Sequence, residues 1–295
     1  MTKKISWELY LSFLSVLKEG SLSGAARALG MTQPTVGRHV AALEGALGVV
    51  LFTRSQVGLM PTEAALALRT HAEAMESTAA SLERTATSQG EGVRGVVRVS
   101  ASEVIMVEVL PPIIAKLRIQ HPKLTLELVL TDRVQDLLRR EVDIAVRMMR
   151  PEQEQLVVQR IGEIELGLHA HKDYLDNHGE PRDLHELTAH SVIGYDQPSS
   201  FIRKAEKTVR GFSRDIFSVR TDSNLAQLAM IRCGAGIGVC QVPLAKRNRD
   251  LKRVLAKTFS LHLDTSVTMH EDLRHSPRCR ATFDALVEGL RRYVT

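Results

Sequence analysis

The chain has 295 residues, of which 44% are hydrophobic and 25% are charged, and its formal net charge at pH 7 is +5. This composition is ordinary for a soluble globular protein, and the length allows two or three domains. No apolar run approaches the ~20 residues that span a bilayer, and no secretory signal core follows the N-terminal lysines. Three scattered cysteines cannot form a disulfide framework. These features argue against membrane contact and predict a cytoplasmic protein.

The first 62 residues carry six Lys or Arg against three Glu, a net charge of +3 that suits phosphate binding without establishing it. Their apolar spacing predicts three short helices, the first ending at Gly20 and the second at Gly30. Thr32 is expected to cap the third helix, with Pro34 in its first turn. Two extended runs around residues 55–58 then predict a hairpin-like wing.

The second and third of these helices, joined by a tight turn at Gly30, predict a helix-turn-helix whose second helix enters the major groove of DNA. Polar side chains occupy the turns that would reach the groove: Gln33, Thr35, Arg38 and His39. Glutamine can pair with adenine, arginine with guanine, and threonine can contact base edges or phosphate. A solvated face on a small helical bundle is the alternative, and the pattern favours DNA binding over it.

A long helix without internal Gly or Pro is predicted from Thr62 until Gly90. Its apolar residues step alternately by four and three, a heptad seam that includes Leu68, Ala72, Met75, Ala79 and Leu82. A lone helix with so narrow a stripe is marginal in water, so the seam predicts a partner helix. The segment SQGEGVRG that follows is predicted to be a flexible hinge.

Strand-like and helix-like runs alternate beyond residue 90. Strands are predicted near 96–101, 124–130, 142–148, 164–170, 190–195, 216–220, 236–243 and 265–270, and helices near 104–120, 132–140, 224–233 and 278–293. Alternation of this kind predicts parallel α/β sheets. The length is generous for one sheet, so we expect two lobes with a cleft between them.

Several well-separated motifs, in this order, resemble those of LysR-type transcriptional regulators. The resemblance begins at FLSVLKEGSLSGAARALGMTQPTVGRHVAALEGALGVVLFTR, continues through GLMPTEAAL, and resumes with LPPIIAKLRIQHPKLTLELVL, DLLRREVDIAVR and GAGIGVCQVP. It covers essentially the whole chain. It implies a winged helix-turn-helix at residues 1–62, a dimerisation helix at 63–89 and a two-lobed, periplasmic-binding-protein-like α/β effector domain at 90–295. Lobe 1 would span about 93–163 and 266–295, and lobe 2 about 164–265.

The resemblance also assigns roles to residues by position. The recognition helix would present Thr32, Gln33, Pro34, Thr35, Arg38 and His39, and the wing would present Arg54 and Ser55. Such regulators pair through the long helix, often assemble as dimers of dimers, and bind partly palindromic double-stranded DNA. They respond to a small-molecule effector, and an activator would also contact RNA polymerase.

The effector cleft is predicted from the ends of the strands, because ligands of open α/β sheets bind beyond the C-terminal ends of strands. Candidate side chains at these ends are Ser100, Ser102, Glu103, Thr131, Arg147, Tyr195, Thr221, Asp222 and Asn224. Any single hydroxyl could instead cap its own helix. Helix N-termini and Arg147 favour a small anion, whereas Glu103 and Asp222 argue against a purely anionic ligand, so the ligand class stays open.

Other motifs carry less weight. The run CGAGIGVC mimics a dinucleotide-binding loop, but it follows a helix and precedes a strand, the reverse of that motif, so Gly234 is predicted to end a helix. Cys233 and Cys240 are predicted to be packed in a buried setting, with a redox-responsive regulator as the alternative. His169 and His171 have no third ligand nearby in sequence, so no metal site is expected.

No enzyme is expected, because the chain has no nucleophile elbow and no fixed Cys/His pairing. No cofactor is expected either, apart from a small-molecule co-inducer of unknown identity. A small-molecule binding protein without DNA function is the remaining alternative, and the winged helix argues against it.

Overall fold

The computed structural model describes residues 5–55, 58–86, 92–131, 141–148, 156–197, 202–203 and 212–294. It divides into two compact units, residues 1–87 with 139–141, and residues 88–138 with 142–295. The helix predicted at 132–140 and the first half of the predicted hinge, residues 88–91, lie outside the described residues. No helix in the described ranges is both long enough and apolar enough to span a membrane.

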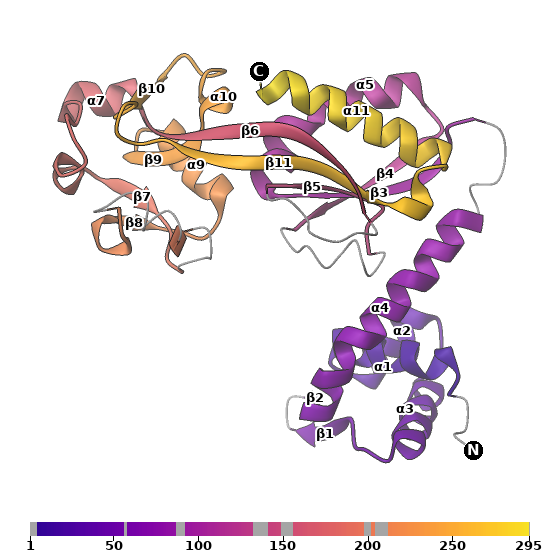
Figure 1. Cartoon of the computed structure of the whole chain (residues 1–295). Coiled ribbons are helices and arrows are strands. Elements are labelled where there is room, and N and C mark those ends of the chain that lie inside the picture. Colours follow the sequence, from indigo (N-terminus) through magenta and orange to yellow (C-terminus); the bar gives the residue numbers. More distant parts are fainter. Residues whose placement is uncertain are drawn as a thin grey trace. The chain divides into compact units, whose positions relative to one another are not determined.

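The first unit is mainly helical and carries a small hairpin (Figure 1). Its elements are α1 (Trp7–Glu19), α2 (Leu22–Leu29), α3 (Gln33–Leu47), β1 (Phe52–Ser55), β2 (Gly58–Pro61) and α4 (Glu63–Ala86). The strands β1 and β2 pair antiparallel and form the predicted wing. Since α2 and α3 are separated by a short turn, the helix-turn-helix and the wing are both confirmed.

Local signals in the sequence place the ends of these helices. Gly20 and Gly30 follow α1 and α2 with φ of 67° and 63°, a left-handed conformation that glycine adopts without strain. The hydroxyl of Ser21 accepts a hydrogen bond from Gly24 N–H at 3.1 Å. Thr32 does the same for Thr35 N–H at 3.4 Å, so the predicted cap of α3 is confirmed.

The core of the first unit joins α4 to the helix-turn-helix. Phe13, Leu14 and Leu43 are buried in one cluster with Ala65 and Ala72 of α4. An ion pair between Lys18 of α1 and Glu76 of α4, with Nζ and Oε2 2.7 Å apart, lies at the edge of this contact. The N-terminal half of α4 is therefore part of the core of the first unit.

The second unit alternates strands and helices along the chain. Its strands are β3 (Gly95–Ala101), β4 (Leu124–Leu130), β5 (Ile144–Arg147), β6 (Leu156–His171), β7 (Val192–Gly194), β8 (Val219–Arg220), β9 (Ile237–Gln241), β10 (Leu251–Val254) and β11 (Leu261–His270). Its helices are η1 (Ile105–Val109), α5 (Leu110–Gln120), α7 (Lys172–His178), η2 (Glu186–Ala189), η3 (Arg214–Ile216), α9 (Asn224–Arg232), α10 (Val242–Ala245), η4 (Glu271–Leu273) and α11 (Pro277–Val294).

The strands form one mixed sheet in the order β4-β3-β5-β11-β6-β9-β7-β8, with β10 pairing β6. The strand β3 is parallel to β4 and β5, and β7 is parallel to β8 and β9. However, β11 is antiparallel to β5 and β6, and β6 is antiparallel to β9 and β10. The predicted parallel pairing is present among β3, β4 and β5 and among β7, β8 and β9. It fails at the two longest strands, because β11 is antiparallel to both of its neighbours and β6 is antiparallel to each strand that it pairs with.

Two groups of elements lie at opposite ends of β6 and β11 (Figure 1). We call lobe 1 the group of β3, β4, β5, η1, α5 and α11, and lobe 2 the group of α7, β7, β8, α9, β9, α10 and β10. The long strands run through both, so the lobes share one hydrogen-bonded sheet. One buried cluster continues from lobe 1 into α9 and β9, and a second lies within lobe 2.

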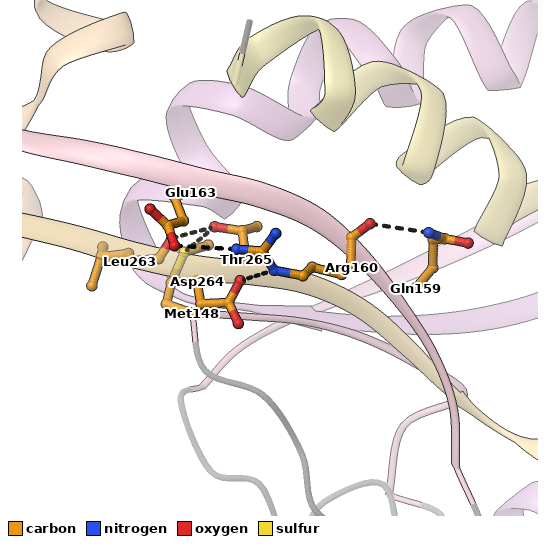
Figure 2. Close-up of polar contacts among 7 residues, drawn as sticks. All are labelled: Met148, Gln159, Arg160, Glu163, Leu263, Asp264 and Thr265. Atoms are coloured by element: carbon orange, nitrogen blue, oxygen red, sulfur yellow. Dashed lines mark hydrogen bonds and ion pairs between the residues drawn. The ribbon is translucent and has the colours of Figure 1, made fainter.

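The pairing of β6 with β11 is interrupted by a bulge between the two lobes. Thr265 pairs with Gly162 and Ser266 with Arg160, so one residue of β6 is extra at this point. Arg160 donates across the bulge to Asp264 Oδ1 at 2.7 Å and to Glu163 Oε1 at 3.1 Å (Figure 2). Since these side chains are exposed, the two ion pairs contribute little to the free energy of folding.

Several predicted elements differ from the structure in their bounds, and two differ by more than their ends. The strand predicted at 216–220 is reduced to β8, two residues long, because η3 occupies its start. The helix predicted at 104–120 is present, but residues 105–109 within it form a π-helical turn, η1, before α5. Pro111 and Pro112 cause this change, because neither has the N–H that an α-helix would need there.

Candidate nucleic-acid interface and effector site

The start of α3 presents a connected set of polar side chains. The hydroxyls of Thr32 and Thr35 are 2.8 Å apart, and Arg38 Nη2 donates to Thr35 Oγ1 at 3.3 Å. Thr32, Gln33, Pro34 and Arg38 are exposed, while Thr35 is half-buried beneath the arginine. These contacts hold the guanidinium near the helix start and restrict the freedom of its side chain.

His39 differs from the other predicted contacts. Its imidazole is half-buried, and Nδ1 lies 2.8 Å from the hydroxyl of Ser12, a fully buried residue of α1. Through this hydrogen bond His39 ties α3 to α1. The ring of His39 is therefore engaged within the unit, whereas the side chain of Arg38 is exposed.

The wing is short and is closed by polar contacts of its own. Ser55 Oγ donates to Gly58 O at 3.1 Å, and Thr53 Oγ1 donates to Met60 O at 3.4 Å. The backbone N–H of Leu59 donates to Gly20 O at 3.2 Å, which fixes the wing to the turn after α1. Arg54 is exposed on this hairpin. The wing thus presents the cationic side chain of Arg54 on a hairpin that is hydrogen-bonded to the turn after α1.

The predicted seam on α4 divides into two parts. Leu68 and Ala72 pack against the core of their own unit, with Ala72 fully buried. Met75 and Leu82 are 42% and 66% exposed, and Ala79 between them is half-buried. Only the C-terminal half of the seam is therefore open to a partner.

Two predicted effector residues are buried together. Ser100 and Arg147 are 0% and 3% exposed, and Arg147 Nη2 donates to Ser100 Oγ at 2.8 Å. A second guanidinium nitrogen donates to Val146 O at 3.2 Å. The side chain of Arg147 is thus engaged beneath the surface, at a depth that sequence position does not reveal.

Four other candidates gather where β3 ends opposite the start of α9. Ser223 caps α9 and also donates to Glu103 Oε2 at 3.1 Å. Tyr195 donates to Asn224 Oδ1 at 2.8 Å, and Thr221 Oγ1 accepts from Ser223 N–H at 3.3 Å. The structure therefore brings residues from both lobes to one place.

The remaining candidates lie at the edges of this cluster. Asp222 Oδ1 accepts hydrogen bonds from the backbone N–H groups of Asp196 and Gln197, at 3.0 and 2.9 Å. Asp196 in turn pairs with Arg214, which lowers the pKa of its carboxyl. Ser102 and Thr131 are half-buried beyond the ends of β3 and β4. Asp222 thus has a structural function in ordering the loop after β7.

The sequence reasoning missed a set of polar contacts between the lobes. Glu108 of η1 pairs with Arg232 of α9, and its carbonyl accepts from Arg247 at 3.0 Å. The adjacent prolines at 111 and 112 were the available signal, because they leave carbonyls of the preceding turn without helical donors.

The cysteines and histidines do not form a reactive centre. Burial raises the pKa of Cys240 to about 12 and lowers that of His169 to about 4, although Cys240 Sγ is 3.3 Å from His169 Nδ1. The pair is therefore a neutral core contact. Cys233 is exposed, which corrects the predicted buried setting: it follows the last residue of α9 and turns outward.

Two further expectations concern this region. Gly234 lies just beyond α9 with φ of 77°, which confirms its predicted position at a helix end. Among the described side chains, no three His, Cys, Asp or Glu are grouped so that they could hold a metal ion.

Comparison with known families agrees with this architecture. A model of bacterial regulatory helix-turn-helix proteins of the lysR family matches residues 7–66. A model of the LysR substrate binding domain matches residues 90–291. Fold and matches together define a winged helix-turn-helix DNA-binding protein with a substrate-binding effector domain. The chain belongs to the LysR family of transcriptional regulators.

Individual relatives share most of the chain. The HTH-type transcriptional regulator CrgA of Neisseria meningitidis serogroup C is 29% identical over 225 residues, 75% of each chain. An HTH-type transcriptional regulator of Xanthomonas campestris pv. campestris is 26% identical over 290 residues, 95% of this chain and 84% of its own.

Solved structures show the same fold. The structure of CrgA from Neisseria meningitidis has a TM-score of 0.60 at 26% identity and covers 98% of this chain and 99% of its own. Full-length CbnR complexed with its target DNA has a TM-score of 0.68 at 21% identity, over 98% and 99% of the two chains. At that identity the second likeness is evidence of fold alone.

Proposed function

We propose that this regulator reads its operator with the start of α3 in the major groove and the wing beside it. Gln33, Thr35 and Arg38 would contact base edges or phosphate, and Arg54 with Ser55 would contact the backbone. The observation that carries this proposal is the Thr32–Thr35–Arg38 chain of side-chain contacts on the exposed face of α3. His39 would support that face from the side of α1.

The proposal is tested by fluorescence anisotropy of the full chain against DNA from immediately upstream of its own gene. The titration is repeated at several salt concentrations and with scrambled competitor DNA. Tight binding that resists the competitor and weakens steeply with salt is expected, because phosphate neutralisation releases counterions. Equal and weak binding to both DNAs would contradict recognition of this operator by α3.

The oligomer would form through α4. Met75 and Leu82 are exposed and Ala79 between them is half-buried, so the three form an apolar stripe at heptad spacing that a second copy of the helix would cover. A homodimer would present two recognition helices to a partly palindromic site, and dimers would pair further into a tetramer. Acting on chromosomal DNA, the protein would work in the cytoplasm, and as an activator it would contact RNA polymerase.

The effector would be a small molecule bound between the lobes, close to Ser102, Glu103, Thr131, Tyr195 and Asn224. Support comes from the contacts that gather residues of both lobes at the start of α9. Thr221 and Asp222 would order the loop beneath the ligand, while Ser100 and Arg147 would support the site from within. A bulky residue at position 102 should abolish the ligand response and spare DNA affinity; a preserved response would contradict this location.

The proposed functions also assign boundaries to the domains. We place the DNA-binding domain at 1–62, the dimerisation helix at 63–89 and the effector domain at 90–295, with lobe 1 formed by about 93–163 and 266–295 and lobe 2 by about 164–265. The bulge in β6 at Gly162 supports the boundary between the lobes.

A further inference from the structure

The turn between β3 and α5 owes its shape to two prolines. In a regular α-helix the residue at position 112 would donate its N–H to the carbonyl of Glu108, and proline has no such group. The chain takes a wider π-helical turn here, in which Leu110 N–H donates to Ile105 O. The carbonyl of Glu108 therefore has no α-helical donor at position 112 and can accept a hydrogen bond from another element.

Lobe 2 supplies that donor and a second contact. Arg247, which follows α10, donates to the Glu108 carbonyl at 3.0 Å. Arg232, the last residue of α9, donates through both Nη atoms to the Glu108 carboxylate at 2.6 and 2.8 Å. The side chain of Glu108 is only 20% exposed, so this bidentate pair is partly shielded from water.

Arg247 is itself held in place by lobe 1. Its guanidinium carbon lies 4.9 Å from the centre of the Tyr293 ring on α11. Tyr293 in turn donates its hydroxyl to Gln241 Oε1 at 2.5 Å. The arginine is therefore a fixed partner for Glu108, and α11 takes part in the same inter-lobe contact.

The other end of α9 is bonded to the same segment of lobe 1. Ser223 Oγ donates to Glu103 Oε2 at 3.1 Å, five residues before Glu108. Between the two ends, Met106 lies in one buried cluster with Leu228 and Ile231 of α9. The helix thus lies along residues 103–108 with a polar anchor at each end.

We propose that these contacts form a latch between the lobes, in which the start of α9 senses the effector and the Glu108 anchor sets how far the lobes open. A ligand at the proposed site competes with the Glu103–Ser223 hydrogen bond, because both use the start of α9. Movement of α9 then strains the Arg232–Glu108 pair at its far end. The response of the latch to a ligand rests on the proposed effector function, whereas the contacts that close the latch do not.

The test measures the distance between the lobes in the full chain, without effector and without DNA. Spin labels are placed at Gln120→Cys on α5 and Glu180→Cys after α7, in a Cys233→Ser background, and labelled chain is mixed with excess unlabelled chain. The variants are Glu108→Ala and Pro112→Ala, the second of which restores a backbone donor to the turn and keeps a helix-forming residue.

The matched control is Glu165→Ala. Glu165 pairs with Arg253 within lobe 2, and the two side chains are 32% and 24% exposed, close to the values of the Glu108–Arg232 pair. If the variants act only by lowering stability, Glu165→Ala should change the distance between the lobes as much as Glu108→Ala does. If the Glu108 contacts hold the lobes together, Glu165→Ala should leave that distance unchanged.

Wild type and Glu165→Ala should give one narrow distance. Glu108→Ala and Pro112→Ala should add a population at longer distance, with the ratio of open to closed molecules raised about tenfold, which corresponds to ~1.4 kcal/mol. Distributions that overlay the wild type for both variants, or an equal change in the control, would overturn the latch. Because neither DNA nor ligand is present, this result is independent of whether the proposed operator contacts and effector site are correct.

Discussion

Replacing Arg38 with alanine should weaken operator binding and leave the fold intact. The side chain is exposed and donates only a long hydrogen bond of 3.3 Å to Thr35 Oγ1, so its loss should change unfolding free energy by less than about 0.5 kcal/mol. A base contact through a guanidinium is worth ~1–3 kcal/mol. Each recognition helix should therefore lose about 5- to 150-fold in affinity.

The assay is the anisotropy titration on the full chain, repeated at several salt concentrations. Arg69→Ala is the matched control, because Arg69 is an exposed arginine on α4 that pairs with Glu73 at 2.8 Å. A base contact predicts that Arg38→Ala loses affinity for the operator more than for scrambled DNA, while a phosphate contact predicts an equal loss and a salt slope smaller by about 1. Operator affinity unchanged in Arg38→Ala, or lowered equally in Arg69→Ala, would refute the assignment of this face to DNA.

Three further changes test other parts of the structure. Thr32→Ala should lower stability by about 1 kcal/mol and weaken operator binding, since α3 loses its cap, and Thr32→Ser should restore both in urea and anisotropy titrations. Glu108→Gln should lower the Tm most near neutral pH: the Arg232 hydrogen bond lowers the carboxyl pKa, so its stabilisation is present above the ordinary carboxyl pKa and lost as pH falls through the lowered one. A Tm difference independent of pH would contradict this. In the folded chain, a thiol reagent at pH 8 should modify Cys233 and spare Cys240 and Cys279, which are buried; rapid labelling of all three would reopen the redox alternative.

Features set by neighbouring residues could be predicted from the sequence. Thr32, Pro34 and the glycines at 20 and 30 act within a few residues of their own position, so the helix ends followed from general rules. The exposed face of α3 could also be predicted, because the helical spacing of Val36, Val40 and Leu43 identifies the buried face.

Features that depend on residues far away in the sequence could not be predicted. The direction of β6 depends on β9, β10 and β11, which lie far along the chain, and a strand pattern is the same in parallel and antiparallel sheets. The burial of Arg147 likewise depends on Ser100, supplied by another strand. Glu108 looked like an ordinary helical carboxylate, although Pro112 marked its turn as irregular.

The order of strands in the sheet has a consequence for synthesis of the protein. The neighbours of β5 are β3, which is made earlier in the chain, and β11, which begins at Leu261 near the end of the chain. At ~5–20 residues per second, a ribosome reaches β11 on the order of ten seconds after completing β5. During that interval the DNA-binding unit has been synthesised completely, while the edge of the buried strand β5 is not yet paired with β11. Nascent chains halted before Leu261 should therefore bind chaperones through lobe 1 and resist proteolysis only in the first unit.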